Sequence, residues 1–445
     1  MRYNFLFLLI AVAAVAYGRP AYTLEQLRDS ALTGNNAMRS ARHDIASAAE
    51  QRREAFTNYF PTVSATGLSF AATQGMMQMD INPGEMLPAS LVGVLAQSMP
   101  AEALAGLATP IGVSMMKHGT LAGVSAVQPV FAGGRIVNGN RLARLGEDVS
   151  QLRLELSTND VLRTTEQYYW QLVTMREKLR TLDAVAALLD GLNKDVTVAV
   201  NAGVTLRNDL LQVQLRQNDI ESQRLKLLNG QAVVKMLLAQ HCALSDTAFD
   251  IVAAPDFNPS LPPRPDHGQA LLATPEYRLL DKQVEAAVLQ TKMERGKAMP
   301  TVSVGVGYNY HNLLGKGTSF GMAFATVSVP ITDWWGTSHA VKRKRLEEVK
   351  ARDQLADNSE LLTIKMQSAW NSVMEARDQL SLAARGIEQA EENLRINRDH
   401  YRAGVSRMSD LLEAQLLYQQ ALDRRADALA TYHNSCLEYR LATAQ

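Results

Sequence analysis

This sequence of 445 residues has few of the features that mark an enzyme or a nucleic-acid-binding protein. Lysine plus arginine and aspartate plus glutamate each number 45, so there is no excess positive charge to bind a phosphate backbone. Aromatic residues make up only 6% of the chain, whereas alanine, leucine and glutamine are abundant. This composition favours long helices over a compact mixed fold.

Long apolar runs are missing after the first 18 residues, which argues against membrane-spanning helices. At the start, Arg2 precedes an apolar segment from Phe5 to Val15, and Ala16-Tyr17-Gly18 is a suitable cleavage site. We therefore predict a secretory signal peptide over residues 1–18. The alternative, a membrane anchor, is disfavoured because the apolar run is shorter than the roughly 20 residues that a spanning helix needs.

Catalytic and metal-binding motifs are also missing. Gly317-Thr318-Ser319-Phe320-Gly321 matches the spacing of a hydrolase nucleophile motif, but it begins an alternating strand and no helix follows it. The eight histidines include no pair at metal-ligand spacing. Cys242 and Cys436, the only cysteines, lie in helical sequence and are predicted to be buried thiols rather than a disulfide. We predict no enzyme activity, no cofactor and no metal site.

What the sequence does contain is an internal duplication. The segment AGVTLRNDLLQVQ at residues 202–214 recurs as AGVSRMSDLLEAQ at residues 403–415, an offset of 201. Phe60-Pro61-Thr62-Val63-Ser64 pairs with Met299-Pro300-Thr301-Val302-Ser303 at an offset of 239. The chain therefore consists of two copies of one unit, and the first copy carries 38 extra residues between positions 64 and 129.

The two repeats are predicted over residues 19–254 and 266–445, joined by a proline-rich connector at 255–265. In the first repeat, Thr23 and Gln26 form a capping-box pattern at the start of a helix. Its expected elements are a helix over 23–59, strands over 62–71 and 120–131, and a helical hairpin over 136–240. Between the strands we expect a long loop with a short helix near 89–107. The second repeat has the corresponding helix over 266–298, strands over 301–310 and 319–331, and a hairpin over 337–443.

The strands are amphipathic. In the first strand, small or apolar Val63, Ala65 and Gly67 alternate with a hydroxyl set assigned as Thr62, Ser64, Thr66 and Ser69. Four strands cannot close a membrane barrel, because single-chain barrels begin at eight. Either the sheet packs against soluble structure, or several copies of the chain pool their strands.

The order of these motifs resembles the TolC-type outer membrane efflux proteins. The resemblance rests on the duplication, the strand entry at Phe60 to Val63, the strand ends Gln128-Pro129-Val130-Phe131 and Val329-Pro330-Ile331, and the two hairpin turns. It implies a mainly helical fold with a membrane β-barrel. Three protomers would pool four strands each into a 12-stranded barrel that continues into an α-helical coiled-coil periplasmic tunnel.

The resemblance also implies location, partners and function. The chain would lie in the outer membrane of a Gram-negative bacterium and extend into the periplasm. As a homotrimer it would contact outer-membrane lipid, a periplasmic adaptor protein and an inner-membrane transporter, but no nucleic acid. It would be the passive exit duct of a tripartite efflux or type I secretion system. A periplasmic coiled-coil scaffold or stalk without a pore is the alternative.

Two groups of residues are candidates for that function. By resemblance, Asp410 and Glu413 would form an acidic ring at the periplasmic gate, and Asp209 in the first repeat would be a capping residue. The alternative is that Asp410 and Glu413 only stabilise a helix N-terminus. The turns at Gly203, Val204 and Thr205 and at Gly404, Val405 and Ser406 would dock the adaptor.

Two further features leave alternatives open. Seven methionines lie between residues 76 and 116, and their thioethers suit either Cu(I) binding or a flexible apolar loop. The basic run Lys342-Arg343-Lys344-Arg345 is expected to be a solvated helix face, or to contact anionic lipid headgroups.

Overall fold

The computed structural model describes residues 20–252, 260–313 and 316–445, so the predicted signal peptide and part of the connector lie outside the described residues. The chain divides into two compact units. The first contains the segments up to Ala48, Gly146–Val284 and Lys350–Gln445, and the second contains Ala49–Leu145 and Glu285–Val349. These units do not follow the two sequence repeats, because each repeat contributes segments to both of them.

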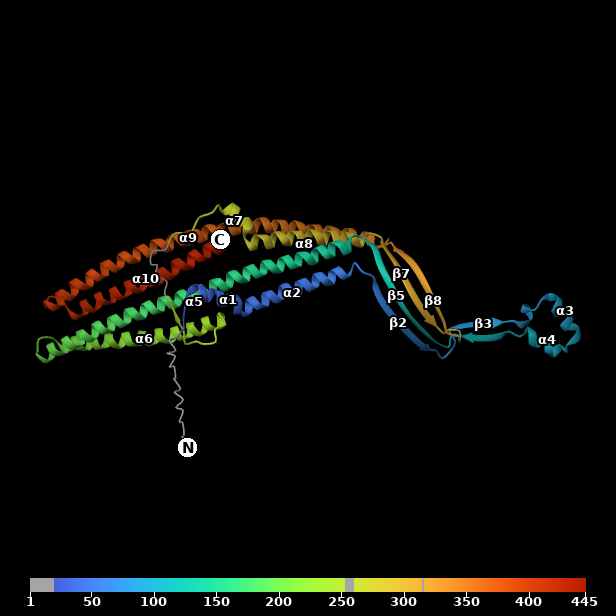
Figure 1. The fold of residues 1–445 in the computed structure, drawn as a ribbon, viewed down its shortest axis with the longest axis horizontal. Coiled ribbons are helices and arrows are strands. Elements are labelled where there is room, and N and C mark those ends of the chain that lie inside the picture. Colours follow the sequence, from blue (N-terminus) through green and yellow to red (C-terminus); the bar gives the residue numbers. More distant parts are fainter. Residues whose placement is uncertain (1–19, 253–259, 314–315) are drawn as a thin grey trace, which may run out of the picture. The chain divides into compact units, whose positions relative to one another are not determined.

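The second unit contains a four-stranded antiparallel sheet (Figure 1). Its strands are β2 (Thr62–Ala71), β5 (His118–Ala132), β7 (Thr301–His311) and β8 (Thr318–Ser328). The order is β2-β5-β7-β8, so the two repeats meet where β5 pairs with β7. Strand β8 ends at Ser328, whereas the sequence predicted an end at 331. The pairing of His311 with Thr318 closes the β7–β8 hairpin.

The segment expected to be a long loop contains a second, smaller sheet. Strands β3 (Met77–Ile81) and β4 (Ile111–Met115) pair in antiparallel register. They carry a short 3-10 helix, Pro83–Met86, and the helices α3 (Ala89–Ser98) and α4 (Ala101–Ala108). The expectation of a loop with one helix was therefore wrong. Five-residue strands leave little room for a visible alternation, yet apolar residues do occupy every second position in both.

Both helices that precede the sheet are divided at equivalent positions, contrary to the expectation of one continuous helix in each repeat. The first repeat has α1 (Leu24–Gly34) and α2 (Asn36–Thr57), and the second has α7 (His267–Ala273) and α8 (Pro275–Lys297). Asn35 divides the first pair, since its side chain accepts from the Ala37 amide at 2.7 Å and donates to the His241 carbonyl at 2.8 Å. Pro275, 240 positions after Asn35, begins α8, where its missing N–H costs nothing.

Two long helical hairpins make up most of the first unit. They are α5 (Arg135–Asn201) with α6 (Arg207–His241), and α9 (Asp333–Arg402) with α10 (Met408–Ala442). Helix α9 begins four residues before the expected position 337. A two-residue parallel pair that the sequence did not indicate, β1 (Ala21–Tyr22) with β6 (Asp250–Ile251), joins the start of the first repeat to its end.

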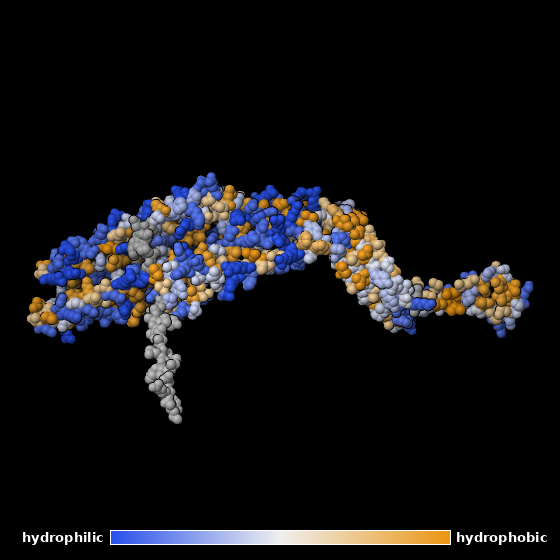
Figure 2. All heavy atoms as spheres, viewed as in Figure 1, coloured by the Kyte–Doolittle hydropathy of each residue, from blue (hydrophilic) through white to orange (hydrophobic). Residues whose placement is uncertain are grey.

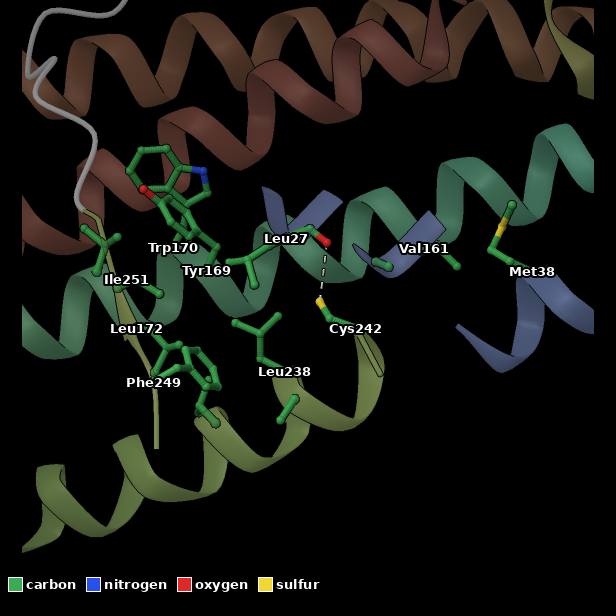
Figure 3. Packing of buried hydrophobic residues seen from close by; sticks show 14 residues of the cluster. Leu27, Met38, Val161, Tyr169, Trp170, Leu172, Leu238, Cys242, Phe249 and Ile251 are labelled. Carbon is green, nitrogen blue, oxygen red and sulfur yellow. Dashed lines mark hydrogen bonds between the residues drawn. The ribbon is translucent and has the colours of Figure 1, made fainter. Parts of the chain in front are cut away.

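The core of the first unit forms where α1, α5 and α6 meet (Figure 3). Tyr169 and Leu172 from α5 pack with Leu238 from α6 and with Phe249. The thiol of Cys242 is buried there and donates to the Leu27 carbonyl at 3.5 Å. Burial raises the pKa of this thiol to about 12, so it stays protonated at neutral pH. Cys436 is also buried and free, and the prediction of two buried thiols is confirmed.

Helix α10 contributes the imidazole of His433 to this unit, and one nitrogen of this ring has no hydrogen-bond partner among the described residues. The ring of His433 stacks on Trp170 with 3.8 Å between centroids and 8° between planes. Burial, and to a smaller extent the Arg440 guanidinium, lower the pKa of His433 from 6.5 to about 4. The neutral ring is therefore the form that the folded protein accommodates.

We predict that this histidine makes the helical unit sensitive to acid. The folded-state pKa is lowered, so stability is fully present above pH 6.5 and falls as the pH drops toward 4. The total loss is on the order of 3 kcal/mol. Denaturant unfolding of the purified protein between pH 7.5 and pH 4 measures it. His433→Phe should flatten the pH dependence, whereas His43→Phe, at an exposed position, should leave it unchanged; equal slopes for both variants would contradict the prediction.

Candidate functional site

The sheet has two strands with a free edge. Among the described residues, β2 pairs only with β5 and β8 pairs only with β7, so each strand leaves one row of backbone N–H and C=O groups without a strand partner. Such edges are sites for pairing with another chain. In β2 nearly every residue is exposed, on both faces of the strand. A sheet with two open edges and two exposed faces is incomplete as a single copy.

The two faces of the sheet differ in chemistry. One, the apolar face, contains aliphatic residues and two tyrosines, namely Val63, Ala65, Val124, Ala126, Val302, Val304, Val306, Tyr308, Tyr310, Ala323, Ala325 and Val327. The other, the polar face, contains most of the hydroxyl and amide groups together with several large apolar side chains. Its polar residues are Thr62, Ser64, Thr66, Ser125, Thr301, Ser303, Asn309, His311, Thr318, Thr326 and Ser328, and its large apolar residues are Leu68, Phe70, Leu121, Val127, Phe320, Met322 and Phe324. Figure 2 shows hydrophobic residues on the surface of these strands.

The strand register corrects the predicted face of one serine and shows how two aromatic rings of the polar face are placed. Ser69 pairs with Thr120 and belongs to the same face as Val63, so its expected place in the hydroxyl set was wrong. Phe70 pairs with Gly119 and Phe324 with Gly305. A Cβ on Gly305 would clash with the Phe324 ring at 2.4 Å, and a Cβ on Gly119 would lie only 3.1 Å from the Phe70 ring. These rings therefore lie along the sheet instead of standing out from it.

The two helical hairpins end in the same backbone turn. In the first, the Gly203 amide donates to the Val200 carbonyl and the Val204 amide to the Ala199 carbonyl, at 3.0 and 2.9 Å. In the second, the Gly404 and Val405 amides repeat this pattern, each at 3.0 Å. This pair of bonds is a Schellman motif. Gly203 and Gly404 have φ values of 70° and 73°, and the backbone of a residue with a side chain would be strained at these values.

Of the predicted docking residues, the two glycines and the two valines are exposed at these turns. Val204 is 80% exposed and Val405 is 73% exposed, although the residue at this position of the motif commonly packs back on its helix. Thr205 is half-buried because its hydroxyl donates to the Asp209 carboxylate at 2.6 Å. Ser406 is half-buried as well, and its hydroxyl has no partner among the described residues.

The two predicted gate residues have different surroundings. The Asp410 carboxylate accepts from the Arg407 amide at 3.1 Å and from the Ser409 hydroxyl at 3.1 Å, so it caps the start of α10. Glu413 is exposed one turn further along α10. Asp209, expected to be the capping residue, instead accepts from the Thr205 side chain. The alternative view of Asp410 as a stabiliser of the helix N-terminus thus describes part of its role.

Sequence reasoning missed a side chain that connects the two turns. Tyr401, in the last turn of α9, lies close to Thr205 and to the Asp209 carboxylate of the other turn. Burial, followed by the Asp209 charge, raises the pKa of Tyr401, so the hydroxyl stays protonated and able to donate. Its position three residues before Gly404 carries no signal in a single sequence, because tyrosine is common on buried helix faces.

A second connection between the repeats lies further from the turns. The Arg216 guanidinium of α6 donates to the side-chain oxygens of Gln415 and Gln419 on α10, at 3.1 and 2.8 Å. Gln419 in turn donates to Gln223 at 3.0 Å. Gln415 and Gln419 are buried, and burial lowers the pKa of Arg216 from its usual range. This charged network connects α6 and α10 at two adjacent turns.

Within residues 20–252, 260–313 and 316–445, no helix is both long enough and apolar enough to cross a membrane. The described residues also contain no group of three or more His, Cys, Asp or Glu side chains placed to hold a metal ion.

Comparison with known proteins supports the resemblance. Residues 268–444 match the model of the family described as "Outer membrane efflux protein". No curated protein matches the chain by sequence. The predicted resemblance to TolC-type outer membrane efflux proteins is confirmed, since the second repeat matches that family's model and solved channels share the fold of nearly the whole chain.

Three of these solved structures are one outer membrane protein and two outer membrane channels. VceC from Vibrio cholerae is 13% identical, with 94% of this chain and 95% of that chain covered and a TM-score of 0.73. The CmeC channel of Campylobacter jejuni is 16% identical, with 94% and 85% covered and a TM-score of 0.75. The open state of the MtrE channel of Neisseria gonorrhoeae is 15% identical, with 94% and 88% covered and a TM-score of 0.71.

These matches confirm the predicted fold class, and they are matches to channels rather than to enzymes.

We predict that the turn glycines stabilise the hairpins through their positive φ. Gly404→Ala should destabilise the protein by about 1 kcal/mol, since a side chain in this region of φ is strained. Gly386→Ala is the matched control. It lies inside α9 with open space around its Cα, so alanine there should stabilise by about 0.5–1 kcal/mol. Thermal unfolding measures both variants, and shifts of the same sign would contradict the prediction.

Proposed function

We propose that this chain forms the outer-membrane exit duct of a tripartite efflux or type I secretion system, as a homotrimer that extends from the outer membrane into the periplasm. Three copies would join the β2 edge of one protomer to the β8 edge of the next and close a 12-stranded barrel. Once closed, the barrel has no unpaired backbone edge in lipid.

The single observation that carries this proposal is the sheet with two open edges and two chemically different faces. The apolar face, which includes Val306 and Tyr308, suits lipid, and tyrosines are enriched at membrane interfaces. The polar face, with Ser64 and Ser125 hydroxyls 3.2 Å apart, suits a water-filled lumen. A soluble stalk would have no use for an exposed aliphatic face next to a hydroxyl face.

The helical hairpins would supply the periplasmic part of the duct. Their paired turns present exposed valines, and we propose that these turns dock a periplasmic adaptor, which connects the duct to an inner-membrane transporter. The duct itself performs no chemistry, so the energy for export comes from that transporter. The Tyr401 contact with Thr205 and Asp209 would hold the two turns of one protomer together while the duct is closed.

Asp410 and Glu413 would form the acidic constriction at the periplasmic entrance. Three copies of these carboxylates around a threefold axis make a ring that attracts cations. One oxygen of the Asp410 carboxylate accepts the capping hydrogen bond from the Arg407 amide. This bond fixes the carboxylate at the start of α10 without neutralising its charge.

We predict that the detergent-purified trimer conducts in planar bilayers, prefers cations and is blocked by multivalent cations from the periplasmic side. Asp410→Asn with Glu413→Gln should abolish the block and reduce cation preference. Asparagine can still cap the helix, so the fold should be kept. Glu360→Gln is the control, because Glu360 is an exposed acid in the half of α9 that is distant from the turn, and this variant should leave the block unchanged.

The outcomes separate the duct from its gate. A mature chain that stays monomeric and soluble without detergent, and that never conducts, would exclude the duct. Conductance with an unchanged cation block in the double variant would keep the duct and exclude the acidic ring.

We further predict contact between the turns and the adaptor. Photo-activatable crosslinkers attached at Thr205→Cys and Ser406→Cys should capture the adaptor in cells that express the complete system, as detected by mass spectrometry. A crosslinker at Glu360→Cys should not. If the turn positions capture no more adaptor than this control, docking occurs elsewhere on the chain.

A further inference from the structure

The β3–β4 segment, which we name the insert and define as residues 72–117, has no counterpart in the second repeat. β2 and β5 pair up to Ala71 and His118, and the equivalent pair in the second repeat is Tyr310 with Ser319. Only residues 311–318 connect that second pair, which accounts for the 38-residue excess found in the sequence. The insert extends the end of the β2–β5 hairpin away from its connections to α2 and α5.

The insert hairpin has one fully apolar face. Register pairs Met77 with Met115, Met79 with Val113, and Ile81 with Ile111, so all six side chains share one face. The opposite face pairs Gln78 with Ser114 and Asp80 with Gly112. Met77, Met79 and Ile111 are each exposed, which leaves much of the apolar face without a partner in a single copy.

This apolar face needs a covering. An isolated two-stranded hairpin is only marginally stable in water, and exposed contiguous apolar surface usually marks an interface. Helix α3 adds exposed Leu91, Val92 and Val94 to the insert and has no buried residue. The apolar face also explains Met77, Met79 and Met115 as apolar contacts, so Cu(I) ligation is not needed to account for these three.

Two observations indicate what covers it. The insert follows directly from β2, the strand whose free edge would pair with the next protomer, so it continues that interface. Its charged residues are Asp80, Glu85, Glu102 and Lys117, which give a net negative charge. Segments that lie on anionic lipid surfaces are instead rich in lysine and arginine. Other copies of the same insert fit this charge better than lipid does.

We propose that the apolar faces of the three inserts pack against one another and form a cap over the outer mouth of the barrel. This inference rests on the proposed trimeric duct. Polar residues such as Gln78 and Asp80 then face outward to water, and the mouth is closed until the inserts separate.

Cysteine crosslinking tests the contact. Because both native thiols are buried, the native chain should form no crosslink and is the control. Under mild oxidation Met79→Cys should give a covalent dimer, since one disulfide joins two of the three copies. Gln78→Cys, on the opposite face, should not. Non-denaturing analysis of both variants must show the trimer; if it is absent, the proposed function fails, and if it is present without the Met79 crosslink, only the cap fails.

A bilayer-depth probe tests the remaining alternative, which is that membrane lipid covers the apolar face of the insert. A fluorophore attached at Met79→Cys that is quenched by brominated lipid in the intact trimer would assign the face to the membrane and overturn the cap. Protection from quenching, together with the crosslink, is the expected result.

Replacing the insert tests the closure. Exchanging residues 72–117 for the sequence of residues 311–318 keeps the strand register of the second repeat. Asn309→Cys lies on the polar face and should react with a bulky maleimide added outside the cell only in the exchanged chain. Val306→Cys, on the apolar face, should remain protected in both chains. Equal labelling of Asn309→Cys in the native and exchanged chains, fast or slow, would contradict the cap.

Discussion

The organising constraint on this protein is the hydrogen bonding of its sheet edges. One copy provides four strands and leaves two edges open, at β2 and at β8. In lipid each unpaired backbone group costs several kcal/mol, so a single copy cannot be stable in a membrane as it stands. The apolar face adds to this constraint, because the exposure of its valines and tyrosines costs little free energy in lipid and much in water. Association of identical copies satisfies the edges, and it follows from the backbone rather than from any specific side-chain contact.

The same constraint explains why the two repeats are joined as they are. β5 of the first repeat pairs with β7 of the second along nearly their whole length, so the repeats are fused at the centre of the sheet. In the helical unit they are connected by side chains instead, through Arg216 with Gln415 and through Tyr401 with Thr205. Backbone pairing is permanent, whereas a few polar side-chain bonds, each worth about 1 kcal/mol net, can be exchanged when the hairpins move. The rigid part and the adjustable part of the protomer thus use different interactions.

Much of this could be predicted from the sequence, because the duplication and the strand alternation are local patterns. The capping box of Thr23 and Gln26 is present as expected, since both partners lie within one turn of chain. The insert hairpin was missed because its strands are short and separated by two helices. The Tyr401 contact and the Arg216 network join residues about 200 positions apart, and no single-sequence pattern encodes such pairs. The break at Asn35 depends on His241, which is equally distant in sequence.

The insert shows how a duplicated fold acquires a feature that its other half lacks. The second repeat turns from β7 to β8 within a few residues, so a hairpin of this sheet needs no longer connection than that. The first repeat has 38 more residues at the equivalent place, and they include a hairpin with one apolar and one polar face. An unselected surface loop would tolerate polar residues at positions 77, 79, 111 and 113, which are instead uniformly apolar. Each protomer has one such hairpin, so threefold symmetry in the proposed trimer would bring three identical apolar faces around one axis. Packing these faces together would remove from water the apolar surface that is left exposed in a single copy.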